Sequence, residues 1–251
     1  MTKSYIWPLA NRFAHILLMI LFAISYILGD FDKLLNLHAA FGLALGVVFF
    51  FRTIWGFIGP KYSRFSDFNF SLKELKNYLL SLFSKTKDYI GHNPASSYAI
   101  VSMIMIAFLT IFTGLLAYGT KENHGIFSFL YDTFLRDIKL FKNIHEFLAN
   151  VFIAIVGVHI AGSLLDKYIK KGDGINSMIN GYKESNTEEN IRLNIFQNLF
   201  SIIWILVSIL SLYYFIFTTN IFIADSSIKQ NNTTLQTNIK LKEFNAIKNN
   251  S

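Results

Sequence analysis

The sequence predicts an all-α membrane protein that consists of a four-helix transmembrane bundle followed by a fifth transmembrane helix. Two observations lead to this fold class. Hydrophobic residues make up 53% of the 251 residues, charged residues only 16%, and the mean hydropathy is +0.40, which is too apolar for an ordinary soluble domain. The apolar residues also gather in separate runs, each of which reaches or approaches the roughly 20 residues needed to cross a bilayer.

The expected spans cover five apolar runs, at residues 13–29, 37–57, 98–119, 145–166 and 194–224. The first run is not a cleaved signal peptide, because Asp30-Phe31-Asp32-Lys33 follows it where a small-residue cleavage site would stand. It also contains His15, which a signal peptide does not need. We therefore count it as the first transmembrane helix.

The segments outside the spans divide the rest of the chain. Residues 71–84 and 126–140 have the amphipathic pattern of helices that lie on a membrane surface or against the bundle. The end of the chain is rich in Asn, Thr, Gln and Lys and has little apolar surface to bury. The expected division is a four-helix domain over residues 1–184, an additional span over 185–224 and a polar tail over 225–251.

Charge and cysteine content exclude several kinds of function. The chain has no cysteine, which excludes disulfides, Cys-ligated zinc, iron–sulfur clusters and covalent c-type haem. The net charge of +7 does not indicate nucleic-acid binding, because Lys and Arg lie in short connections between apolar runs. One side of the predicted bundle carries 14 of the 23 Lys and Arg residues. The positive-inside rule then places the N-terminus in the cytoplasm and, with five spans, the tail outside.

Four histidines within the predicted spans are the main candidates for chemistry. His145 and His159 are 14 residues apart, so they share one helix face at depths that differ by about 21 Å. His15 lies at the inner level with His159, and His38 at the outer level with His145. A titratable side chain inside a membrane indicates a functional site. Two imidazoles that face each other between helices are what a six-coordinate haem needs.

Other residues extend this hypothesis, each with a simpler alternative. Gly42 and Gly46 follow His38 at four-residue intervals and would let a flat macrocycle approach, although small residues in membrane helices also serve close helix packing. Arg52 follows His38 by 14 residues and would pair with haem propionates at the inner level, or extend to the membrane surface as a cation at a helix end. His92 and Asn93 are candidates for a quinone site, whereas His124 is expected in solvent.

Taken together, these residues resemble the bacterial cytochrome b561 family, which includes b-type cytochrome subunits of nickel–iron hydrogenases. The similarity runs from about Trp7 to Lys183. The stretches that carry it agree in order and spacing: His15 after Arg12, His38 with Gly42, Arg52-Thr53-Ile54-Trp55-Gly56-Phe57-Ile58-Gly59 with Arg64-Phe65, Gly91-His92-Asn93-Pro94, His145-Glu146 with His159, and Ser177-Met178-Ile179-Asn180-Gly181-Tyr182-Lys183.

The resemblance implies a four-helix core that binds two non-covalent b haems, with axial ligands His15, His38, His145 and His159. It further implies a bacterial inner-membrane protein of a respiratory chain. Such a protein passes electrons between menaquinone or ubiquinone and a periplasmic partner, either a c-type cytochrome or a hydrogenase, and acts as a quinol oxidoreductase only together with that partner. Two alternatives remain open: a helix bundle that translocates protons or ions, and a membrane anchor subunit without redox activity. A visible spectrum discriminates between the three.

Overall fold

The computed structural model describes residues 2–81, 89–137, 139–185 and 189–217. Within these ranges, five helices are long and apolar enough to cross a membrane, which confirms the predicted number of spans. Four of them are α1 (Leu9–Leu28), α2 (Leu35–Ile58), α4 (Pro94–Glu122) and α5 (Leu140–Tyr168). The fifth span is the helix Ile195–Phe217, so residues 218–224 of the predicted span lie outside the described residues, as does the tail.

The helices begin and end where the local chemistry favours it. The short turn η1 (Asp32–Leu34) leads from α1 into α2. Before α4, the Asn93 side chain accepts a hydrogen bond of 2.8 Å from the backbone N–H of Ser96, and Pro94 occupies the first turn. The same helix ends at Asn123, whose φ of 56° breaks the helical path. α5 begins at Leu140, five residues before the predicted span. Its first turn therefore lies in the connection that precedes the span.

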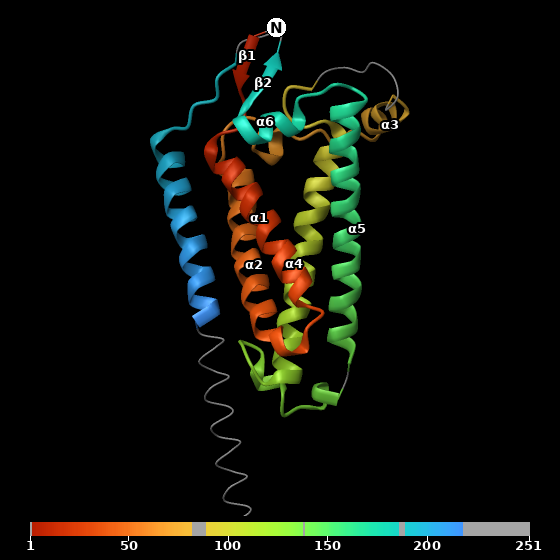
Figure 1. Ribbon diagram of the computed structural model, residues 1–251, viewed down its shortest axis with the longest axis vertical. Helices are drawn as coiled ribbons and strands as arrows, with labels where there is room; N and C mark the ends of the chain where they lie inside the picture. Colours follow the sequence, from red (N-terminus) through yellow and green to blue (C-terminus); the bar gives the residue numbers. More distant parts are fainter. Residues whose placement is uncertain (1, 82–88, 138, 186–188, 218–251) are drawn as a thin grey trace, which may run out of the picture.

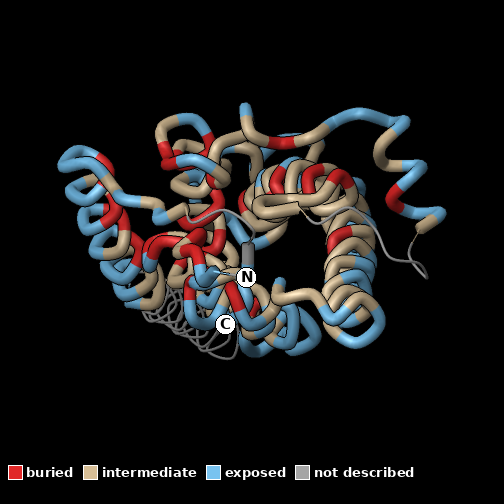
Figure 2. The backbone as a smooth tube through the Cα atoms, turned by 90° about the horizontal axis from the view of Figure 1, so that it is seen from above, coloured by how far each residue is buried: buried red, intermediate tan, exposed pale blue. Residues whose placement is uncertain are grey.

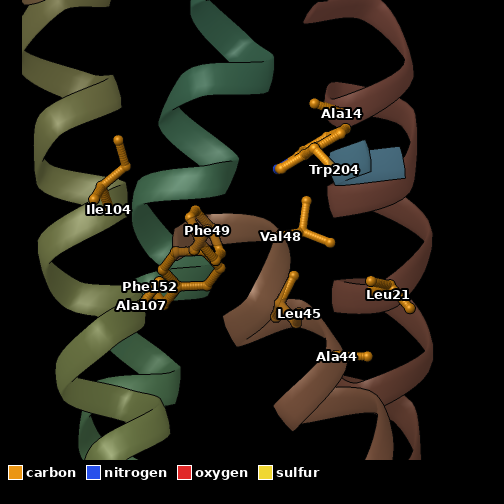
Figure 3. Packing of buried hydrophobic residues seen from close by; sticks show 10 residues of the cluster. All are labelled: Ala14, Leu21, Ala44, Leu45, Val48, Phe49, Ile104, Ala107, Phe152 and Trp204. Atoms are coloured by element: carbon orange, nitrogen blue, oxygen red, sulfur yellow. The ribbon is translucent and has the colours of Figure 1, made fainter. Parts of the chain in front are cut away.

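The membrane helices form a bundle in which α1 packs against α2, α2 against α4, and α4 against α5 (Figure 1). In the described part of the chain, the backbone of α5 does not pack closely against α1 or α2. Side chains cross that separation: Phe152 of α5 contacts Phe49 of α2, with ring centres 6.1 Å apart. Figure 3 shows this pair beside Ala107 and Ile104 of α4, with Val48, Leu45 and Leu21 on the other side.

The fifth span packs on the side of the bundle formed by α1 and α2 (Figure 1). The Trp204 side chain lies beside Ala14 in Figure 3 and its ring centre is 5.7 Å from that of Phe51. Phe200 stacks on Trp55 at 6.0 Å with an interplanar angle of 12°. The span therefore adds a fifth helix to a complete four-helix bundle.

Apolar side chains cover the outer surface of the bundle. Figure 2 shows exposed residues along the outward faces of the helices and buried residues toward the interior. Two apolar side chains of α5 are examples: Val158 is 70% exposed and Phe147 is 65% exposed. Large exposed apolar surfaces are costly in water but not in lipid. This surface agrees with the hydropathy in identifying an integral membrane protein.

A small sheet closes the end of the bundle near the N-terminus. Strand β1 (Thr2–Tyr5) pairs antiparallel with β2 (Tyr182–Ser185), so that Tyr5 lies opposite Tyr182 (Figure 1). The turn η2 (Phe65–Asp67) and the helices α3 (Leu72–Leu80) and α6 (Gly174–Asn180) lie at the same end. The sequence analysis did not predict this sheet, because four-residue strands so far apart in the chain leave no local signal.

The two predicted amphipathic helices have different outcomes. The first is confirmed as α3, where the Ser71 hydroxyl accepts a hydrogen bond from the N–H of Glu74; residues 82–84 of the prediction lie outside the described residues. The prediction of a helix over 126–140 was wrong, because the described part of that segment forms two short turns, η3 (Ser128–Leu130) and η4 (Phe134–Asp137). Thr133 bonds the Leu130 carbonyl and the Leu135 N–H, which replaces helical hydrogen bonds locally.

Gly181 controls the junction between the sheet and α1. Its φ is 89°, and its carbonyl accepts backbone hydrogen bonds from Ile6 at 2.9 Å and Trp7 at 3.1 Å. A Cβ at Gly181 would lie 2.6 Å from the Tyr5 ring.

We therefore expect Gly181→Ala to lower the free energy of unfolding by about 1–3 kcal/mol, seen as a lower apparent melting temperature in detergent. The control Gly157→Ala adds a Cβ with nothing within 4 Å; equal melting temperatures for both variants would contradict this role.

Candidate functional site

Two histidines face each other at the end of the bundle away from the sheet. His38 stands in the first turn of α2 and His145 in the second turn of α5. Their ring centres are 5.8 Å apart and their planes cross at 82°. The predicted pairing at this outer level is confirmed.

Each ring of this outer pair is anchored by a backbone carbonyl of the neighbouring helix. His38 Nδ1 lies 2.8 Å from the Ser25 carbonyl oxygen of α1, and His145 Nδ1 lies 2.8 Å from the Thr110 carbonyl oxygen of α4. A carbonyl only accepts hydrogen bonds, so each Nδ1 carries the proton. A ring that carries its only N–H on Nδ1 has a lone pair on Nε2, which is the form that binds metals.

The second pair lies at the end of the bundle that carries the sheet. His15 belongs to α1 and His159 to α5, and their ring centres are 6.3 Å apart with planes at 58°. The predicted pairing at the inner level is confirmed as well. α5 thus contributes one imidazole to each pair, while α1 and α2 each supply one partner.

The spacing of both pairs suits a flat metal-containing group. Two imidazoles that bind one metal ion from opposite sides, each through a bond of about 2 Å, have ring centres roughly 6 Å apart. No group of three or more His, Cys, Asp or Glu side chains gathers as a metal site within the described residues. A metal held by one pair would need further ligands, and a porphyrin supplies four.

Two arginines at the inner end carry buried N–H groups that lack a partner. Arg12 donates from Nη1 to the Ile179 carbonyl at 2.6 Å, but its Nε has no hydrogen-bond partner within the described residues. The same holds for Nη1 of Arg52, whose guanidinium lies 5.6 Å from the centre of the Phe65 ring. A buried unpaired donor is costly, so these groups fit an anionic acceptor such as a propionate. The sequence reasoning singled out Arg52 and used Arg12 only as part of a motif.

The glycines predicted to admit a cofactor lie against neighbouring helices. A Cβ at Gly42 would meet the Ser25 hydroxyl at 3.5 Å, and one at Gly46 would meet Ile111 at 3.3 Å. These contacts are those of close helix packing. Two glycines that the sequence reasoning missed lie against the histidines: a Cβ at Gly29 would be 3.3 Å from the His38 ring, and one at Gly114 would be 2.9 Å from the His145 ring.

The two residues predicted for a quinone site have different surroundings in the structure. Both ends of the Asn93 amide are engaged: Oδ1 caps α4, and Nδ2 donates to the Tyr78 hydroxyl at 3.0 Å. Asn93 is therefore a capping residue. The His92 ring lies 4.9 Å from both the Trp7 and Phe68 rings. Burial, reinforced by nearby positive charge, lowers the pKa of His92 to about 3, so the ring is neutral.

An aromatic layer separates the two histidine levels. Phe152 is seven residues from each histidine of α5, halfway between the pairs. Its ring centre is 4.9 Å from that of Phe22 on α1 and 6.1 Å from that of Phe49 on α2.

His124, in contrast, lies in the loop after α4, where its ring packs against Tyr118 at 5.6 Å. It takes no part in either pair.

A membrane helix bundle that presents imidazoles in facing pairs at two depths is the arrangement of a membrane b-type cytochrome. Residues 6–181 match the family model for prokaryotic cytochrome b561, and the chain belongs to this family. Two relatives, each called probable Ni/Fe-hydrogenase 1 B-type cytochrome subunit, come from Escherichia coli K12 and Escherichia coli O157:H7. Each is 26% identical over 165 residues, which cover 59% of this chain and 68% of the relative. No solved structure gives a significant match.

Proposed function

We propose that this cytochrome holds two b haems, one between His15 and His159 and one between His38 and His145. In this proposal the protein carries electrons across the bacterial inner membrane between the quinone pool and a redox partner on the periplasmic face. The observation that carries the proposal is the pair of facing imidazoles at each level. The hydrogen bonds that leave Nε2 of His38 and His145 available for a metal support it.

The residues around each pair have distinct roles in this proposal. A bound haem supplies reversible one-electron exchange at its iron. The histidines fix the two positions along α5, and Phe152 with its aromatic neighbours keeps water out of the space between them. Arg12 and Arg52 would bind the carboxylates of the inner group through their unpartnered N–H groups. Their positive charge would also favour the reduced state at that level.

The redox partner and the quinone are proposed by class only. The names of the relatives refer to a nickel–iron hydrogenase, which favours a hydrogenase over a c-type cytochrome as the partner. The distribution of Lys and Arg supports a cytoplasmic position for the sheet end. Menaquinone or ubiquinone would then react near the inner pair, where His92 is the remaining candidate for a contact.

The first test is the spectrum of the purified protein, made with an ample haem supply. We expect b-type absorption bands that sharpen on reduction, and a haem content of two per chain. A colourless protein would instead favour a membrane anchor or an ion-translocating bundle.

Removal of one histidine from each pair separates the two sites. We expect His159→Ala to lose the inner haem and His145→Ala to lose the outer haem, each halving the haem content measured in extracts. The control His124→Ala should keep both, because His124 lies in a loop beside Tyr118. Full haem content in His159→Ala would refute the assignment of the inner ligands.

The role of Arg52 is tested by removal of its charge. We expect Arg52→Gln to lower the midpoint potential of one haem by tens of millivolts, because a nearby positive charge stabilises the reduced state. A potentiometric titration followed by absorbance measures this shift. Arg64→Gln is the matched control, since Arg64 is paired with Asp67 at 3.4 Å and is partly exposed. Identical potentials in both variants and the wild type would exclude the proposed contact of Arg52 with the inner group.

A further inference from the structure

Each outer histidine bonds a backbone carbonyl of a neighbouring helix, and in both helices a glycine follows that carbonyl by four residues. In α1 the carbonyl that binds His38 belongs to Ser25, four residues before Gly29. In α4 the carbonyl that binds His145 belongs to Thr110, four residues before Gly114. We propose that Gly29 and Gly114 are positioning residues that set the orientation and basicity of the two outer histidines. This inference rests on the proposed function, because it assumes that the outer pair binds haem.

The first step is that each carbonyl accepts more than one hydrogen bond. The Ser25 carbonyl also accepts from the backbone N–H of Gly29 at 3.2 Å. The Thr110 carbonyl also accepts from the Thr113 hydroxyl at 3.0 Å. A carbonyl oxygen can accept more than one hydrogen bond, so an imidazole that reaches it from the side can add a bond to those made within the helix.

The second step is that a Cβ at either glycine would crowd the ring that approaches the carbonyl. At Gly114 a Cβ would lie 2.9 Å from both Nδ1 and Cε1 of His145, which is closer than side chains tolerate. At Gly29 a Cβ would lie 3.3 Å from the same two atoms of His38. The ring would have to move, more at the first site than at the second. The hydrogen bonds of 2.8 Å would then lengthen or break.

Simple helix packing does not account for these two glycines. Gly46 shows what packing looks like here, since its missing Cβ faces the aliphatic side chain of Ile111. Gly29 and Gly114 face imidazole rings instead, and both rings bond to the carbonyl one turn earlier. Glycine also weakens a helix relative to alanine, so its presence inside α4 calls for a compensating role.

The third step connects this geometry to redox properties. An imidazole that donates its Nδ1–H to a carbonyl is a more basic ligand through Nε2. A more basic ligand stabilises ferric iron and lowers the midpoint potential. The same hydrogen bonds fix the ring planes of the outer pair near 82°, and the g-values of a low-spin ferric haem depend on that angle. Within the described residues, neither ring of the inner pair has such a carbonyl bond.

The experiment compares Gly114→Ala, Gly29→Ala and the control Gly157→Ala, whose added Cβ meets nothing within 4 Å. Haem content, potentiometric titration and electron paramagnetic resonance of the ferric form are measured on each full-length protein. The signal that His145→Ala removes identifies the outer haem. We expect Gly114→Ala to raise the potential of the outer haem and shift its largest g-value, and Gly29→Ala to do the same to a smaller extent. The inner haem and the control should not change.

The outcomes distinguish this inference from the proposed function. An outer haem with wild-type potential and g-values in Gly114→Ala overturns the inference. If Gly114→Ala loses the outer haem, Gly29→Ala decides: a raised outer potential supports the inference, and wild-type values overturn it. A wild-type protein in which His38 and His145 hold no haem would instead refute the proposed function.

Discussion

The arrangement of the bundle depends on one constraint, which is that a polar nitrogen inside a membrane must find a partner within the protein. Water is absent there, and backbone carbonyls are already used by their own helix. His38 and His145 resolve this by donating to carbonyls of the adjacent helices α1 and α4. The two hydrogen bonds therefore fix the neighbours α1–α2 and α4–α5, which are also the pairs that pack closely along their length. Nε2 of both rings is left for chemistry.

The same constraint is met differently at the inner level. His15 and His159 face each other without a described carbonyl partner, and the buried donors that lack a partner within the described residues include N–H groups of Arg12 and Arg52. In the proposed function, the outer haem would thus be tuned by neutral hydrogen bonds to its ligands, and the inner haem by positive charge beside its ligands. Hydrogen bonds to the ligands lower a haem potential, whereas nearby cations raise it. The two levels should differ in potential for reasons that are built into opposite ends of the bundle.

The sequence was sufficient to predict the parts of this design that follow from helical period and membrane depth. The 14-residue interval places His145 and His159 on one face, and their partners follow from depth alone. The pairing of β1 with β2 could not be predicted, because it joins opposite ends of the described chain. The position of Gly114 against the His145 ring could not be predicted either, because the sequence of a membrane helix does not show whether a glycine faces a methyl group or an imidazole.

The fifth span, which lies beyond the residues matched by the family model, contacts the bundle close to Arg52 at the inner level. Its polar anchor is Gln197, which donates to the Ile58 carbonyl at the inner end of α2 at 2.9 Å. Trp204 and Ser201 line a small cavity together with Arg52. The helix therefore shields Arg52 from lipid, and a charge shielded in this way acts more strongly on neighbouring groups. An added helix can change the electrostatics of one level while the histidine pairs stay as they are.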